Sequence, residues 1–86
     1  MSPTVLVVED EPAILELIKV NLVDAGYEVQ GAADAETAQD LLKAALPDLV
    51  LLDWMLPGVS GIELARRLRS DKRTKAVPII MLTARA

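Results

Sequence analysis

Residues 48–61, with the sequence DLVLLDWMLPGVSG, decide the fold of this chain. The stretch opens with an apolar run over residues 49–52, places the carboxylate of Asp53 where that run ends, and breaks at Pro57-Gly58. A short uninterrupted apolar run is typical of a strand buried on both faces, and hence of a parallel sheet covered by helices. Chemistry in such sheets lies beyond the carboxyl ends of the strands. Asp53 is therefore either a reactive group or an acid that only caps a turn.

The rest of the chain supplies strands and helices in alternation. Strands are expected over residues 4–8, 27–30 and 78–83, with residues 27–30 at an edge because their pattern alternates. Helices are expected to run from Pro12 to the stop at Gly26, from the cap Asp34 to before residue 47, and from a capping box at Ser60 to about residue 70. In the last helix, Ile62, residue 65 and residue 68 are expected to face the sheet. The alternation predicts an α/β protein with a doubly wound parallel sheet covered on both faces.

Composition narrows the range of functions. The 86 residues suffice for one small domain, and they include no cysteine and no histidine. This excludes a disulfide framework, a thiolate metal site and any histidine-dependent triad, and leaves carboxylates as the main candidates for chemistry. There is no apolar run of 18 residues, so we expect a soluble, cytoplasmic protein without a membrane partner.

The net charge of −4 hides an asymmetry along the chain. Residues 1–63 hold 12 acidic and 2 basic side chains, whereas residues 64–86 hold 1 acidic and 7 basic ones. A basic run of this kind can bind nucleic acid. No aromatic residues are interleaved with it, which favours a solvated helix face and loop instead.

Four polar side chains are expected to meet at one edge of the sheet. In a doubly wound order, the carboxyl ends of the first, third and fourth strands lie side by side and gather Glu9, Asp10, Asp53 and Thr83. Clustered carboxylates repel one another and stay ionised when a cation lies among them. An all-oxygen site of this type favours Mg²⁺. A carboxylate can also attack phosphorus and form an acyl phosphate, with the Thr83 hydroxyl donating to a phosphoryl oxygen.

Three motifs, VVEDEP over residues 7–12, LLDWMLPG over residues 51–58 and MLTA over residues 81–84, resemble the receiver domain of two-component response regulators. The second motif, followed by Ser60-Gly61, is most similar to the PhoB-like branch of the OmpR/PhoB family. The resemblance implies a flavodoxin-like fold and a switch, not an enzyme with turnover. It also implies that a sensor histidine kinase phosphorylates Asp53 and that the output is transcriptional.

The resemblance assigns roles to individual residues. It implies that Asp10, Asp53 and the backbone carbonyl of Met55 ligate Mg²⁺, and that Glu9 holds a metal-bound water. Thr83 is expected to bind the phosphoryl group and relay its presence to a distant surface. Trp54 is expected to control access to the site, which Pro57 and Ala84 flank within the matching motifs.

The family domain has five strand–helix units, and this chain stops just after the fourth strand. We therefore expect residues 1–86 to form the N-terminal portion of a receiver with strand order 2-1-3-4, without helix four, strand five and its lysine, or helix five. DNA binding would need an output domain that this chain lacks. Strands one and three are expected to be uncovered on one face, and the chain to self-associate through that face and the Ile79–Leu82 edge.

Two other functions remain open. The first is an interaction module that dimerises but is not phosphorylated, since the family lysine is missing. The second is a Mg²⁺-dependent phosphatase with an aspartate nucleophile. Such enzymes usually place a second acid two residues after the nucleophile, and that position is Met55 here.

Overall fold

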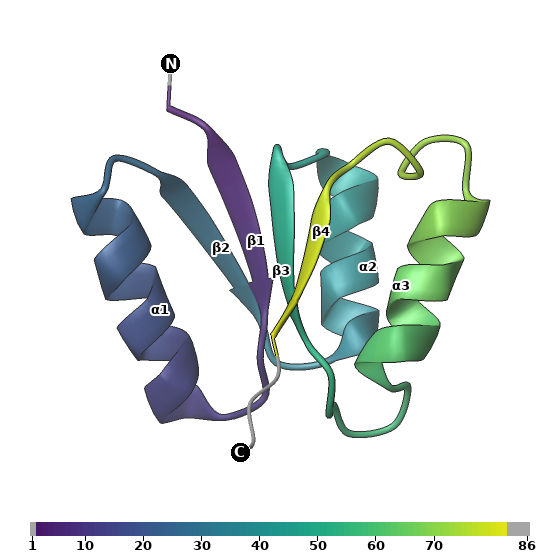
Figure 1. Ribbon diagram of the computed structural model, residues 1–86, viewed down its shortest axis with the longest axis horizontal. Coiled ribbons are helices and arrows are strands. Elements are labelled where there is room, and N and C mark those ends of the chain that lie inside the picture. Colours follow the sequence, from purple (N-terminus) through teal and green to yellow (C-terminus); the bar gives the residue numbers. More distant parts are fainter. Residues whose placement is uncertain (1, 83–86) are drawn as a thin grey trace.

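The computed structural model describes residues 2–82 and contains four strands and three helices in strict alternation (Figure 1). The elements are β1 (Thr4–Val8), α1 (Pro12–Asp24), β2 (Glu28–Ala32), α2 (Ala35–Ala44), β3 (Leu49–Asp53), α3 (Gly61–Ser70) and β4 (Ile79–Leu82). The alternation predicted from the sequence is confirmed. None of the helices in residues 2–82 combines the length and apolar character needed to cross a bilayer.

The strands form one parallel sheet with the order β2-β1-β3-β4, as predicted. Its register aligns Val8 of β1 with Leu52 of β3, and Asp53 at the end of β3 with Leu82 of β4. Because all four strands run in the same direction, their carboxyl ends share one edge of the sheet. The residues that follow β1 therefore lie beside Asp53.

Local signals begin and end the helices. Gly26 follows α1 with a φ of 98°, in the left-handed region that glycine enters without a steric cost, and the N–H of Tyr27 donates to Leu22 O (3.0 Å). Asp34 caps α2 by accepting the N–H of Thr37 (2.7 Å), and this hydrogen bond lowers the pKa of the Asp34 carboxyl.

The cap of α3 is one half of the predicted capping box. Ser60 Oγ accepts the N–H of Glu63 (3.1 Å), as expected. The Glu63 carboxylate does not complete the box; it pairs along the helix with Arg66 (2.9 Å) and Arg67 (3.5 Å). Arg66 and Arg67 lie one helical turn away and carry positive charge, so they attract the Glu63 carboxylate more strongly than a single backbone N–H does.

The main core lies between the sheet and the pair α2 and α3, on the opposite side from α1 (Figure 1). The strands contribute alternate residues to it, such as Leu6, Val50 and Leu52, all at most 1% exposed. From α3 it receives Leu64 and Leu68. The prediction that Ile62 faces the sheet is wrong, since that side chain is 44% exposed. Leu64, not Ile62, lies on the same helical side as Leu68.

The other face of the sheet is only partly covered, because α1 packs on β2 and β1. Val5 and Val7 of β1 are buried beneath this helix, so the expectation that strand one is uncovered is wrong. Leu49 and Leu51 of β3 are half-buried, and Ile80 of β4 is 51% exposed. The uncovered apolar surface thus belongs to β3 and β4, as predicted for strand three.

β2 extends two residues further than its predicted range of 27–30. Glycine weakens strand interiors, yet Gly31 lies within β2. In the folded chain, Gly31 is paired with Val7, and a Cβ at this position would lie 3.1 Å from a methyl carbon of Leu15. The packing of α1 on β2 is therefore close at this point, and a side chain at position 31 would displace the Leu15 side chain by a few tenths of an ångström.

Candidate functional site

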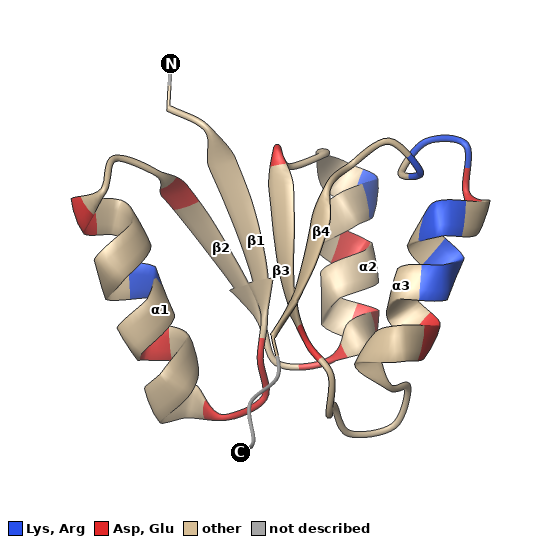
Figure 2. Cartoon of the chain, viewed as in Figure 1, with Lys and Arg blue, Asp and Glu red and all other residues tan. Residues whose placement is uncertain are grey.

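Three of the four predicted site residues converge at the carboxyl edge of the sheet. Glu9 and Asp10 follow β1 and Asp53 ends β3. Figure 2 shows acidic residues at this end of β1 and β3. Carboxylate oxygens of Glu9, Asp10 and Asp53 lie within 4.8 Å of one another. Glu9 and Asp53 are buried and Asp10 is exposed. Thr83 and Ala84 lie outside the described residues.

The hydrogen bonds at the site leave one carboxylate oxygen without a partner. Asp53 Oδ1 accepts the N–H of Met55 (3.3 Å), and Glu9 Oε2 accepts the N–H of Glu11 (3.0 Å). Asp53 Oδ2 is buried and accepts no hydrogen bond from the described residues. Buried polar atoms are almost always paired, so an orphaned oxygen beside two further carboxylates fits a cation or another ligand.

Burial and like charge both act on Glu9. Desolvation raises the pKa of its carboxyl above the ordinary value, and the neighbouring charges of Asp53 and Asp10 raise it further. The N–H of Glu11 opposes the shift by donating to the carboxylate. Glu11 occupies the cap position of α1, and its side chain makes no cap hydrogen bond.

The donor set fits a hard divalent cation. Three carboxylates within a few ångströms provide the oxygen ligands that Mg²⁺ and Ca²⁺ prefer, and a bound cation would offset the repulsion that raises the pKa of Glu9. Exposed Asp10 leaves one side open to solvent, which suits an ion that keeps part of its water shell.

Gly61 supports the site in a way that sequence analysis did not recognise. A Cβ at this position would lie 2.1 Å from the carbonyl oxygen of Asp53, a distance no side chain can accept. The N–H of Gly61 also donates to Trp54 O (3.0 Å), so α3 begins directly against the end of β3. The signal was present in the sequence as a glycine immediately after a helix-capping serine.

The loop after Asp53 exposes apolar side chains beside the site. Trp54 is 48% exposed and Met55 is 57% exposed. The backbone of Trp54 is hydrogen-bonded to the backbones of Leu82 and Gly61, and the N–H of Met55 donates to Asp53 Oδ1. Pro57 lines a separate open depression of about 360 Å³ together with Asp34 and Val59. The Trp54 ring is thus a solvent-accessible neighbour of the carboxylates.

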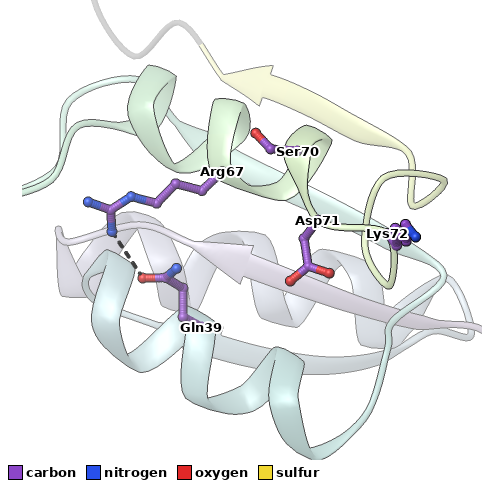
Figure 3. A pocket seen from close by; sticks show the side chains of 5 residues that line it. All are labelled: Gln39, Arg67, Ser70, Asp71 and Lys72. Carbon is purple, nitrogen blue, oxygen red and sulfur yellow. Dashed lines mark hydrogen bonds between the residues drawn. The ribbon is translucent and has the colours of Figure 1, made fainter.

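A larger depression lies away from the carboxylates, between α2 and α3 (Figure 3). It is a shallow hollow of about 650 Å³, lined by Gln39, Arg67, Ser70, Asp71 and Lys72. Its size does not make it the reactive site, because the buried orphaned oxygen and the clustered acids are at the sheet edge.

Comparison with known proteins identifies the family. The family model described as "Response regulator receiver domain" matches residues 5–86. The chain belongs to the response regulator receiver family. It is 54% identical over 85 residues to the phosphate regulon transcriptional regulatory protein PhoB of Rhizobium meliloti, and 55% identical to PhoB of Pseudomonas aeruginosa. Each alignment includes 99% of this chain and 37% of the relative. The chain therefore spans about a third of the length of these relatives.

Solved structures support the same assignment. The receiver protein of Methanoculleus marisnigri superposes on this receiver chain with a TM-score of 0.93 at 38% identity, covering 96% of this chain and 68% of that one. The response regulator TrrA of Thermotoga maritima, solved in complex with Mg²⁺ and BeF, gives a TM-score of 0.90 at 43% identity and covers 100% and 72%. This chain is therefore a PhoB-like receiver domain of a two-component response regulator, with a flavodoxin-like fold. It is a signalling domain, not a catalytic enzyme.

Proposed function

We propose that Asp53 is the phosphoacceptor of this receiver and that a sensor histidine kinase is the donor. The observation that carries the proposal is the buried Oδ2 of Asp53, which has no hydrogen-bond partner among residues 2–82 and belongs to the cluster with Glu9 and Asp10. In the transfer, a carboxylate oxygen of Asp53 forms a bond to phosphorus as the bond from phosphorus to the donor nitrogen breaks. The product is an acyl phosphate on Asp53, and the donor imidazole leaves with a proton.

We propose Mg²⁺ as the cation of the site. Asp10 and Asp53 would hold it directly with the carbonyl of Met55, and Glu9 would hold one of its waters. The N–H of Met55 on Asp53 Oδ1 supports this arrangement because it holds the Met55 backbone at the site. When bound, Mg²⁺ supplies positive charge that offsets the carboxylates and the phosphoryl oxygens.

Trp54 and Thr83 complete the proposed switch. The exposed side chain of Trp54, the residue after Asp53, supports a role in controlling which donors reach Asp53. The role of Thr83 as hydrogen-bond donor to the phosphoryl group rests on the family motif and on the pairing of Asp53 with Leu82, the residue before it. Movement of Thr83 towards the phosphoryl group would pass the signal to a transcriptional output.

Intact-mass measurement tests the proposal. The chain is incubated with Mg²⁺ and phosphoramidate, a small phosphodonor that needs no kinase. We expect one phosphoryl adduct in the wild type, the same adduct in the control Asp24→Asn, and none in Asp53→Asn. Bound Mg²⁺ without an adduct would favour the unphosphorylated interaction module. Release of free phosphate over many turnovers would favour a phosphatase, which the exposed Met55 side chain at the second-acid position already argues against.

We further propose that the chain self-associates through the outer edge of β4 and the uncovered face of β3 and β4. In the described sheet, β4 pairs only with β3, and its outer backbone groups have no strand beside them. Leu51 and Ile80 add apolar surface next to that edge. An unpaired apolar edge is a template for a further strand. Light scattering that finds a folded monomer at all concentrations would contradict this proposal.

A further inference from the structure

A second charged surface lies on the opposite part of the molecule from the phosphoacceptor site. Basic side chains gather on the C-terminal half of α3, the loop after it and the end of α2 (Figure 2). We call this surface the basic face; it comprises Lys43, Arg66, Arg67, Arg69, Lys72, Arg73 and Lys75. Three acids, Asp40, Glu63 and Asp71, lie among these residues. The surface therefore carries a clear excess of positive charge.

The arginines of the basic face are largely used within the fold. Arg69 donates to the carbonyls of Lys75 (3.0 Å) and Val77 (2.8 Å), and Arg73 donates to the carbonyls of Leu42 and Lys43. These bonds hold the arginines in place without neutralising their charge. Arg66 and Arg67 share the carboxylate of Glu63 and contribute less.

The three lysines are the free cations of this surface. Lys43, Lys72 and Lys75 are exposed, and their ammonium groups make no hydrogen bond or ion pair with any residue in the range 2–82. They come from two segments that the fold brings together. Lys43 and Asp71 line one hollow, and Asp71 and Lys72 line the neighbouring hollow.

The hollow between α2 and α3 indicates the kind of partner (Figure 3). Its lining of Gln39, Arg67, Ser70, Asp71 and Lys72 contains no apolar side chain. Protein interfaces have an apolar or aromatic centre, and single-stranded nucleic acids are held by stacking on aromatic rings. Neither feature is present here. Apart from Asp71, whose carboxylate accepts the N–H of Arg73 (2.8 Å), the lining offers amide, hydroxyl, ammonium and guanidinium groups. These are the side chains that contact the phosphates of a duplex.

We propose that the basic face itself binds the phosphate backbone of double-stranded DNA without reading its sequence, in contrast to the expectation from the sequence that DNA binding needs an output domain. The missing aromatic residues, which argue against stacked bases, do not affect contacts to phosphates. The acids at the sheet edge lie away from the basic face, so repulsion by the duplex would turn the basic face towards it (Figure 2). This interaction does not depend on phosphorylation of Asp53.

Salt dependence gives the expected size of the effect. Each lysine that neutralises a phosphate contributes a slope of about −0.9 to the logarithm of the binding constant against the logarithm of salt concentration. Three lysines therefore predict a slope of about −3 and binding that is measurable only at low salt. Fluorescence anisotropy of a labelled random-sequence duplex, titrated with the full 86-residue chain at several salt concentrations, measures this slope.

The decisive variant is the triple replacement Lys43→Gln, Lys72→Gln and Lys75→Gln. We expect it to bind duplex about tenfold or more weakly at low salt and to lose most of the slope. The matched control is Lys19→Gln on α1, which removes the one lysine outside the basic face and should leave binding unchanged. Circular dichroism checks that each variant is folded, and these exposed lysines support no packing.

Three outcomes would overturn the proposal. The first is no duplex binding by the folded wild type at low salt. The second is a loss in Lys19→Gln of about a third of that in the triple variant on the logarithmic scale, because an equal loss per removed charge would assign binding to overall charge. The third is binding of a labelled poly-glutamate peptide, abolished by the triple variant, when the duplex does not bind; this would assign the basic face to an acidic protein.

Discussion

At the scale of single residues, the clustering of three carboxylates costs free energy and creates a site that can bind a cation. Glu9 is 2% exposed and lies beside Asp53, so its ionised form pays for both desolvation and repulsion. Surfaces usually keep such groups apart. Three acids held within 4.8 Å on two neighbouring strands indicate that the fold tolerates this cost for a site that binds a cation.

The raised pKa of Glu9 gives a pH-dependent stability. Because this pKa is higher in the folded chain than in the unfolded one, Glu9 contributes most stability below the ordinary glutamate pKa, and that contribution is lost as pH rises through the raised value. In chelator, Glu9→Gln should therefore gain stability relative to wild type as pH rises. Urea unfolding across the pH series measures the difference, with Glu16→Gln on α1 as the control. A constant difference at every pH would contradict the shift.

Gly61 is the residue whose replacement should damage the site most directly. In Gly61→Ala, the new methyl group meets the carbonyl oxygen of Asp53, and the backbone at the start of α3 must move. We expect a loss of about 3 kcal/mol in the free energy of unfolding. Weaker cation binding should accompany it, measured by isothermal titration calorimetry with Mg²⁺.

Gly58→Asn is the control for that substitution. Gly58 has a φ of 72°, which asparagine tolerates better than other residues, and a Cβ there would have no heavy atom within 4 Å. Its cost should be below about 1 kcal/mol. If both variants lost the same stability, the contact with Asp53 would not be the reason glycine is needed at position 61.

At the scale of elements, Arg73 joins α2 to the loop that leads into β4. Its guanidinium donates to the last carbonyls of α2, at Leu42 and Lys43, which have no partner within the helix. Arg73→Met keeps the aliphatic stem and removes these bonds, so we expect a loss of about 1–2 kcal/mol. Chemical denaturation measures it.

Arg66→Met provides the comparison for Arg73. Arg66 forms an exposed pair with Glu63 on α3, and such surface pairs contribute about 0–1 kcal/mol. If Arg66→Met proved as costly as Arg73→Met, the bonds from Arg73 to α2 would not be what holds this region together.

The elements also show where sequence reasoning succeeds. Local chemistry is sufficient for the caps at Asp34 and Ser60 and for the stop at Gly26, because each acts on neighbouring backbone atoms. The meeting of Glu9 and Asp53 was predictable too, since parallel strands place their carboxyl ends together. The meeting of the two acids could be predicted from the order of the elements and the positions of the apolar runs alone.

Prediction from the sequence failed where the structure depends on a contact between residues far apart in the chain. Gly31 continues β2 because Leu15 of α1 packs against it, and no local pattern contains that pair. Ile62 with Ala65 and Leu64 with Leu68 are two apolar pairs at helical spacing, and the position of α3 on the sheet selects the pair of Leu64 and Leu68. The need for glycine at position 61 likewise comes from Asp53, eight positions earlier in the chain.

At the scale of the whole molecule, the two sides of the sheet are unequally protected. α2 and α3 cover most of one side, whereas α1 leaves β3 and β4 partly bare on the other. A small domain already buries a modest share of its surface, so additional cover should stabilise it noticeably. A second copy that pairs along β4 would cover Leu51 and Ile80 in both chains.

Association of this kind predicts a melting temperature that depends on concentration. Because a dimer is favoured by mass action, raising the chain concentration a hundredfold should raise the melting temperature of the wild type by several degrees. Ile80→Lys places a charge on the apolar surface beside the β4 edge and should remove the dependence, with a monomer in sedimentation equilibrium. Ile62→Lys is the matched control, since Ile62 is similarly exposed but lies on α3 on the other side of the sheet. A wild type whose melting temperature is the same at both concentrations would exclude association through this edge.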